Sequence, residues 1–306
     1  MLNTKDISVV IPYYNDHESI EKCLNSVLNQ SLRPREVIIV DDCSGQVSKE
    51  ILIKVVAGFN TNIITVYHNQ NRMNGAFCRN FGMRNAKGYY ISLLDGDDYW
   101  EKEHLKLSYD FLKKSDSDFV YSNIVREKFT SKEVIKVSNI GDVDIDSTNI
   151  LFNQPPQTGS FFFKRDVYEK IKFDESLNRH QDYQFFYDII NSNFIVKYSN
   201  QNTAVYCTSP RPRKDRVDPM SSLKFWHSVR SQVDRELLIK KLIYFLYLSL
   251  RYNKPGAKEI INELESLNCK NKLFSAIRKF GNGKVSYFIS LYLYIFVYDL
   301  KGWLRK

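Results

Sequence analysis

Apolar residues in the first hundred positions form short continuous runs that alternate with helical patterns. Four runs have the length and composition of buried strands, and they lie at residues 7–11, 36–40, 63–67 and 89–94. Residues 18–30, 49–59 and 77–86 instead place apolar side chains at helical spacing. Continuous apolar strands separated by helices are typical of a mostly parallel sheet with helices on both faces. The pattern therefore predicts an α/β fold, with ligands bound at the carboxyl ends of its strands.

The pattern changes after residue 98 and again near residue 208. Further strands near residues 119–125 and 159–164, and a helix near residues 182–191, indicate a mixed continuation of the first fold. Residues 209–216 are rich in Pro, Arg and Lys and interrupt any regular pattern. Helical segments without a convincing strand follow them. We therefore predict two domains, an α/β domain over residues 1–207 and a helical region over residues 208–306.

The net charge of +9 is concentrated in the predicted helical region. Residues 1–207 contain 24 Lys and Arg against 27 Asp and Glu, whereas residues 208–306 contain 20 against 8. The apolar, Tyr-rich stretches 237–250 and 285–300 have basic flanks. Such helices either pack within the protein or lie on an anionic membrane surface, and both interpretations stay open. No nucleic-acid-binding motif accompanies the charge, so we expect no nucleic-acid partner.

The cysteines and the N-terminus predict a cytoplasmic setting. The five cysteines include no C-x-x-C pair, which disfavours a disulfide framework or a structural zinc site. The first residues lack the pattern of a signal peptide, and no run reaches the 18 apolar residues of a typical membrane span. We expect the protein in the cytoplasm, with its basic tail as a peripheral contact at the inner face of the cell membrane.

Carboxylates gather directly after the fourth apolar run. Asp95, Asp97 and Asp98 lie within four positions and would repel one another unless a cation lay among them. Oxygen ligands suit a hard ion such as Mg²⁺ or Mn²⁺, which keeps positions open for substrate phosphates. The alternative is a solvated acidic turn.

Two further polar clusters follow the first and second apolar runs. Asp41 and Asp42 offer acceptors for a nucleotide base or a ribose, although such residues also form turns and helix caps. Pro12, which we expect to end the first strand, precedes Tyr13 and Tyr14. An aromatic ring there stacks on a nucleobase or packs in the protein, and the pattern alone does not choose between the two.

As an ordered set, these segments resemble the family 2 glycosyltransferases, which are inverting enzymes with the GT-A fold. The resemblance spans residues 7–207, and its matching segments are 9–15, 37–44, 74–80, 88–98, 173–176 and 181–186. It implies a GT-A domain, Rossmann-like with a mostly parallel sheet, followed by the helical region. Within the family, the chain is similar to enzymes that build bacterial surface polysaccharides such as O-antigen and capsule.

The resemblance also implies a nucleotide-sugar site and a metal site. The implied nucleotide-sugar residues are Pro12, Tyr14, Asp42, Gly75, Arg79, Asp95 and Gly96. Tyr14 would stack on uracil and Asp42 would accept a hydrogen bond from its N3–H. Asp95 and Asp97 form the D-x-D motif that would hold Mn²⁺ or Mg²⁺ on the diphosphate.

Asp182 lies where the family places its catalytic base. The family often has Glu-Asp at this point, whereas this chain has Gln181-Asp182, so the departure affects only the first of the two residues. Without the resemblance, a helix N-cap would be the ordinary interpretation of Asp182.

The resemblance therefore implies transfer of a hexose or an N-acetylhexosamine from a UDP-sugar to a glycan. A metal ion neutralises the leaving diphosphate, and one base deprotonates the acceptor hydroxyl as it attacks. A single displacement inverts the anomeric centre and forms a β-linkage. By analogy, the acceptor is a glycan on a polyprenyl diphosphate, so the expected partners are a UDP-sugar and a lipid-linked sugar.

Two alternatives stay open at the level of sequence. A sugar-phosphate nucleotidyltransferase would have a Gly- and Lys/Arg-rich loop after the first strand, whereas residues 13–18 read Tyr-Tyr-Asn-Asp-His-Glu. A non-catalytic nucleotide-sugar-binding module would be expected to lack some of the four carboxylates Asp42, Asp95, Asp97 and Asp182, which are all present.

Overall fold

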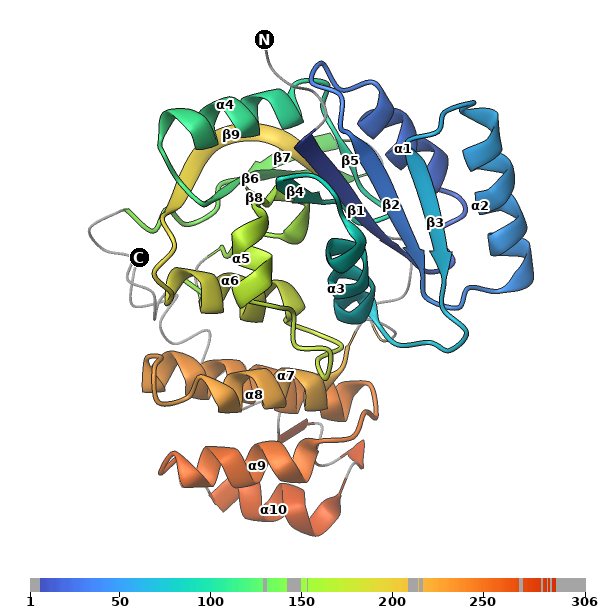
Figure 1. Ribbon diagram of the computed structural model, residues 1–306. Coiled ribbons are helices and arrows are strands. Elements are labelled where there is room, and N and C mark those ends of the chain that lie inside the picture. The colour runs from blue at the N-terminus through green and yellow to red at the C-terminus, as the bar shows by residue number, and fades with distance from the viewer. Residues whose placement is uncertain are drawn as a thin grey trace. The chain divides into compact units, whose positions relative to one another are not determined.

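The computed structural model contains one large sheet, with helices packed on it and a further group of helices later in the chain (Figure 1). The residues that it describes are 6–128, 131–141, 150–152, 154–208, 214, 217–269, 272–281, 283–284, 286 and 288–289.

The first four strands form the parallel part of the sheet. They are β1 (Ile7–Tyr13), β2 (Glu36–Asp41), β3 (Ile64–His68) and β4 (Tyr90–Leu93), in the order β3-β2-β1-β4. The intervening helices are α1 (Ile20–Leu28), α2 (Gln46–Gly58) and α3 (Gly75–Asn85). β1, β2 and β4 are almost entirely buried, as expected for strands covered on both faces. The predicted alternation of strands and helices is confirmed here.

The remaining strands make the sheet mixed rather than mostly parallel. They are β5 (Tyr99–Trp100), β6 (Phe119–Lys128), β7 (Ser131–Ile135), β8 (Phe162–Lys164) and β9 (Val196–Cys207). β8 pairs antiparallel with β4 and β6, β5 pairs antiparallel with β9, and β7 pairs antiparallel with β6. Only β9 on β6 adds a parallel pair. Both faces of β6 and β8 are largely buried, so these strands have the continuous apolar composition that is also typical of parallel strands. Their composition therefore does not reveal the direction in which they pair.

Pro12 does not end β1, contrary to the sequence expectation. β1 pairs with β4 only as far as Val10, and beyond that point it pairs with β2 alone. A proline, which lacks the N–H donor, is tolerated where a strand has lost one of its two neighbours. β1 therefore continues to Tyr13, whose carbonyl accepts a hydrogen bond of 2.8 Å from the Asp42 N–H.

Aromatic side chains fill the core beneath the mixed part of the sheet. The helices here are α4 (His104–Lys114), α5 (Arg165–Lys170) and α6 (Gln181–Ile190), with a 3₁₀ turn, η2 (Thr158–Ser160). Phe185 of α6 stacks on Phe173 with a centroid distance of 4.1 Å, and Phe186 packs on Phe119 and Phe161. These fully apolar contacts anchor α6 to the sheet and so fix the helix that begins with Gln181.

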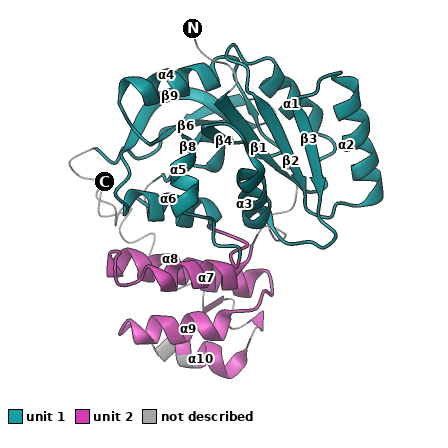
Figure 2. Cartoon of the chain, in the orientation of Figure 1, with its two compact units in different colours: residues 1–175, 181–209 teal, residues 176–180, 210–306 magenta. Residues whose placement is uncertain are grey.

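The chain divides into two compact units (Figure 2). The sheet unit comprises Met1–Glu175 and Gln181–Ser209, and the helical unit comprises Ser176–His180 and Pro210–Lys306. The described helices of the helical unit are α7 (Pro219–Ser228), α8 (Arg235–Arg251), α9 (Ala257–Ser266) and α10 (Lys272–Phe280). The sequence pattern did not predict that residues 176–180 would group with these later helices.

Among the described residues, no helix has both the length and the apolar character needed to cross a membrane. Most of the apolar stretch 285–300 lies outside those residues. The expected contact of the basic tail with an anionic membrane therefore stays a prediction.

Gly82 on α3 gives a direct test of the packing between α3 and the parallel strands. A Cβ at this position would overlap Val10 Cγ1 and lie 3.4 Å from Val40 Cγ2. We expect Gly82→Ala to lower the free energy of unfolding by about 1–3 kcal/mol, measured by urea denaturation. Gly58→Ala is the control, because nothing lies within 4 Å of its added Cβ. Equal stability of both variants would contradict this packing.

Candidate active site

Three loops meet at the carboxyl edge of β1, β2 and β4. The Ser19 hydroxyl, at the start of α1, donates a hydrogen bond of 3.0 Å to the Gly96 carbonyl in the loop after β4. A Cβ at Gly96 would lie only 3.3 Å from the Pro12 carbonyl oxygen. The Asn15 N–H donates to Ser44 Oγ at 2.9 Å, which joins the loops after β1 and β2. The three polar clusters predicted from the sequence are therefore neighbours in space.

Asp41 and Asp42 have different environments although they are adjacent. The Asp41 carboxylate is buried and accepts from the Ser44 N–H at 3.0 Å and contacts His68 Nδ1 at 2.9 Å. It therefore stabilises the turn after β2. Asp42 Oδ1 accepts from the Met73 N–H at 2.7 Å and from Asn69 Nδ2 at 3.3 Å. Asp42 thus faces the loop that precedes α3.

Tyr14 also contacts the loop before α3. The Arg72 guanidinium lies over the Tyr14 ring, with its central carbon 4.0 Å from the ring centroid. The next residue, Met73, donates its N–H to Asp42. The loop before α3 therefore contacts both Tyr14 and Asp42. The sequence analysis did not identify Arg72 or Met73, because a cation–π contact and a backbone donor leave no motif.

Asp95 lies between a buried cation and η2. Arg79 Nη2 donates to Asp95 Oδ1 at 2.5 Å, and Thr158 Oγ1 donates to Asp95 Oδ2 at 3.5 Å. η2 is itself held in place, because Trp100 Nε1 donates to the Gly159 carbonyl at 2.7 Å. Thr158 is a further site residue that no sequence motif indicated.

The carboxylates after β4 create a strongly negative environment. Burial, followed by the negative charges of Asp97 and Asp95, raises the pKa of Asp98 well above its usual range. Asp98 accepts a hydrogen bond of 2.8 Å from the Cys207 N–H, so its role is structural. Asp95 and Asp97 are partly exposed and so can contact a ligand. A divalent cation fits this donor set, because it would offset their combined negative charge.

No group of three or more His, Cys, Asp and Glu side chains with a metal-binding arrangement occurs in the described part of the chain.

Arg79 connects α3, the loop after β4 and the start of α6. Its side chain is almost fully buried, and Nη1 donates to Gln181 Oε1 at 2.9 Å while Nη2 bonds to Asp95. A Cβ on Gly75 would lie 3.0 Å from Arg79 Nη1 and 3.1 Å from Gln181 Oε1. Gly75 therefore provides the space in which these two side chains meet. The departure from Glu-Asp to Gln181-Asp182 provides a neutral acceptor for Arg79.

Asp182 is the second residue of α6, in its first turn. Burial raises its pKa to about 6, and the positive charge of Arg79 and a hydrogen bond from the Tyr183 N–H oppose that rise. The Asp95 charge adds to the rise, so both side chains belong to one electrostatic site. A carboxylate with this pKa is ionised at neutral pH and is a better proton acceptor than an ordinary aspartate.

Comparison with known families agrees with this geometry. The model of the family described as "Glycosyl transferase family 2" matches residues 8–188, more than half of the chain. The chain belongs to glycosyltransferase family 2. This membership sets aside the alternative of a nucleotidyltransferase.

The curated relatives are matched by this chain over only part of their own length. The amylovoran biosynthesis glycosyltransferase AmsB of Erwinia amylovora is 34% identical over 195 residues, covering 58% of this chain and 62% of AmsB. The poly(ribitol-phosphate) beta-glucosyltransferase of Bacillus spizizenii is 32% identical over 185 residues, covering 58% of this chain and 28% of that protein. The Escherichia coli UDP-Glc:alpha-D-GlcNAc-diphosphoundecaprenol beta-1,3-glucosyltransferase WfgD is 27% identical over 175 residues, covering 53% of this chain and 67% of WfgD.

Solved structures confirm the GT-A fold. Staphylococcus aureus TarS 1–349 in complex with UDP-GlcNAc matches with a TM-score of 0.63 and 20% identity, covering 86% of this chain and 80% of that chain. The Pyrobaculum calidifontis mannosyltransferase PcManGT, in complex with GDP-Man and Mn²⁺, matches with a TM-score of 0.52 and 14% identity, covering 98% of this chain and 88% of PcManGT. At these identities the likeness concerns the fold alone.

Proposed function

We propose that this family 2 protein transfers a hexose or an N-acetylhexosamine from a UDP-sugar to a glycan acceptor, with inversion of the anomeric centre. The proposal rests chiefly on one observation, the buried Arg79 that bonds both Asp95 and Gln181. This contact brings the D-x-D loop and the start of α6, with Asp182, into a single site.

The nucleotide end of the site comprises Tyr14 and Asp42. In this proposal the Tyr14 ring, which also contacts the Arg72 guanidinium, stacks on a planar base, and the buried Asp42 carboxylate accepts a hydrogen bond from it. Uracil matches this pair, because its N3–H donates and its ring stacks. The structural neighbour TarS 1–349 was solved with UDP-GlcNAc, which supports UDP as the nucleotide for this chain.

Asp95 and Asp97 are the residues that would hold Mn²⁺ or Mg²⁺. When bound, such an ion neutralises the charge that develops on the leaving diphosphate. PcManGT, a structural neighbour, was solved with Mn²⁺, which supports a divalent ion of this type. Arg79 fixes the position of Asp95 through its 2.5 Å contact.

Asp182 acts as the general base of the proposed reaction. It takes the proton of the acceptor hydroxyl while the hydroxyl oxygen forms a bond to the anomeric carbon. The bond from that carbon to the diphosphate oxygen breaks, and UDP leaves with the bonding electron pair. Because the hydroxyl attacks in one step from the face opposite the leaving diphosphate, an α-linked donor gives a β-linked product, unlike the two-step route of retaining enzymes.

The acceptor that we propose is a lipid-linked glycan of a bacterial surface polysaccharide. The support comes from the relatives, since AmsB is named for amylovoran biosynthesis and WfgD for an acceptor on diphosphoundecaprenol.

A panel of nucleotide sugars tests the donor class. The panel contains UDP-glucose, UDP-galactose, UDP-GlcNAc and UDP-GalNAc, with GDP-mannose as the control, and a synthetic sugar-diphosphate-lipid as acceptor. We expect transfer, detected by mass spectrometry, from at least one UDP-sugar and none from GDP-mannose. Binding of UDP-sugars without transfer or donor hydrolysis would instead identify a non-catalytic binding module.

Asp97→Asn tests the metal site. We expect at least an approximately 100-fold loss of transfer, the scale expected for removing an electrostatic stabiliser of the leaving group. UDP affinity in the presence of Mn²⁺ should fall in the same variant, and EDTA should abolish activity of the unmodified protein. Asp110→Asn, at an exposed position on α4, is the control and should change neither. Full activity in EDTA would contradict the proposed metal dependence.

Asp182→Asn tests the base. We expect a loss of transfer of about 10²–10⁴-fold, because an amide cannot take the acceptor proton, and an unchanged affinity for UDP. Asp188→Asn, on the exposed side of the same helix, is the matched control. The transfer rate should rise with pH through about 6, because Asp182 must lose its proton to accept another. A near-normal rate in Asp182→Asn would exclude this role.

A further inference from the structure

The five residues that precede α6 belong to the helical unit rather than to the sheet unit. The chain leaves the sheet unit after Glu175, contributes Ser176–His180 to the helical unit, and returns to the sheet unit at Gln181 (Figure 2). Asp182 follows only two residues after His180. The contacts of Ser176–His180 with the later helices therefore involve the residues that immediately precede α6 and Asp182.

Ser221 of α7 binds the backbone of this segment. Its Oγ accepts hydrogen bonds of 2.9 Å from both the Asn178 N–H and the Arg179 N–H, and it donates to the Arg179 carbonyl at 3.3 Å. A serine hydroxyl has one donor and two acceptor positions, so these three bonds use its full capacity. Asn178 Nδ2 adds a bond of 3.2 Å to Asp218, the N-cap residue of α7.

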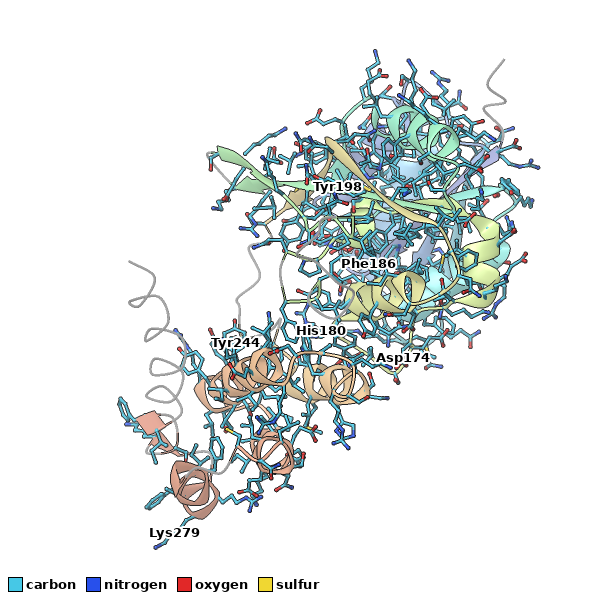
Figure 3. The ribbon with its side chains drawn as sticks, turned by 90° about the vertical axis from the view of Figure 1, so that its left-hand side faces the viewer. Asp174, His180, Phe186, Tyr198, Tyr244 and Lys279 are labelled. Atoms are coloured by element: carbon cyan, nitrogen blue, oxygen red, sulfur yellow. The ribbon has the colours of Figure 1, made fainter. Side chains whose placement is uncertain are left out.

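The ring of His180, which is labelled in Figure 3, packs among aromatic side chains of α7 and α8. The ring stacks on Phe225 at a centroid distance of 5.4 Å and an interplanar angle of 12°. It meets Trp226 and Phe245 edge-on, at 6.0 Å and 5.6 Å. Burial and the nearby charges of Lys241 and Arg179 lower the pKa of His180 to about 3, so the ring is neutral and serves as a packing group.

The backbone at His180 is left-handed, with a φ of +63°. Histidine adopts this region more readily than most residues, but it still does so rarely. The aromatic contacts of the ring and the Ser221 bonds on the two preceding residues hold this conformation. His180 therefore depends on these contacts for its backbone conformation, one residue before α6 begins.

Together, these contacts point to a local role for Ser221 and His180 in ordering the segment joined to α6. We infer that Ser221 and His180 are positioning residues that hold the start of α6, and with it Asp182, in the geometry needed for transfer. The inference rests on the proposed function only for the role of Asp182. A displacement of about 1 Å at a reacting group is enough to cost roughly 100-fold in rate, so loosening this segment should affect the chemical step.

Ser221→Ala and Ser222→Ala form a matched pair for the test. Both serines are buried on α7, but Ser222 Oγ donates to the Asp218 carbonyl at 2.9 Å and does not contact the segment before α6. We expect Ser221→Ala to lower kcat about 10- to 100-fold while KM for the UDP-sugar and the affinity for UDP stay unchanged. Ser222→Ala should keep kcat. His180→Gly, which allows the same φ without the ring, should lower kcat as Ser221→Ala does.

Amide hydrogen exchange tests the same anchor without any need for activity. Measured by mass spectrometry on the full chain, exchange over residues 176–185 should increase in Ser221→Ala and His180→Gly but not in Ser222→Ala. Unchanged exchange in the first two variants, or equal effects of both serine variants on kcat, would overturn the inference. If the unmodified protein transfers no sugar while the exchange result holds, the proposed function fails and the anchoring role stands.

Discussion

The buried guanidinium of Arg79 is the interaction on which the site depends most. A charge removed from water destabilises a protein unless it is paired and hydrogen-bonded. Arg79 is paired through two of its three nitrogens, since Nη2 bonds Asp95 in the loop after β4 and Nη1 bonds Gln181 at the start of α6, while its buried Nε has no hydrogen-bond partner among the described residues. Pairing this one cation therefore connects the loop with the D-x-D motif to the helix with Asp182. Gly75 permits the arrangement, since a side chain there would occupy the same space.

Local sequence patterns predicted the first part of the fold, in which the parallel strands β1 to β4 alternate with helices. β1, β2 and β4 are buried on both faces, so their apolar runs were plain, and the acidic residues after β2 and β4 marked the correct edge of the sheet. Antiparallel β8 was harder to predict, because a strand buried on both faces has the same composition in either direction. Pro12 gave a wrong boundary, since its effect depends on where the neighbouring strand β4 ends.

The long-range contacts within the site escaped the sequence analysis. Asp95 was identified from the carboxylate cluster after the fourth apolar run and Asp182 through the family resemblance, but no pattern connected them to each other or to Thr158. Gln181 had been noted only as a departure from the family, whereas in the structure it is the acceptor for Arg79. Likewise, the contact of Ser221 with Asn178 joins residues 43 positions apart, and neither residue stands in a recognisable motif.

The anomeric configuration of the product is the most direct measurement of the central claim. An α-linked UDP-sugar would be transferred to a defined acceptor, and the new linkage would be assigned by NMR from the coupling of its anomeric proton. A single displacement assisted by Asp182 predicts a β-linkage. An α-linked product would contradict it, because retention requires either a second displacement or attack on the same face as the leaving diphosphate.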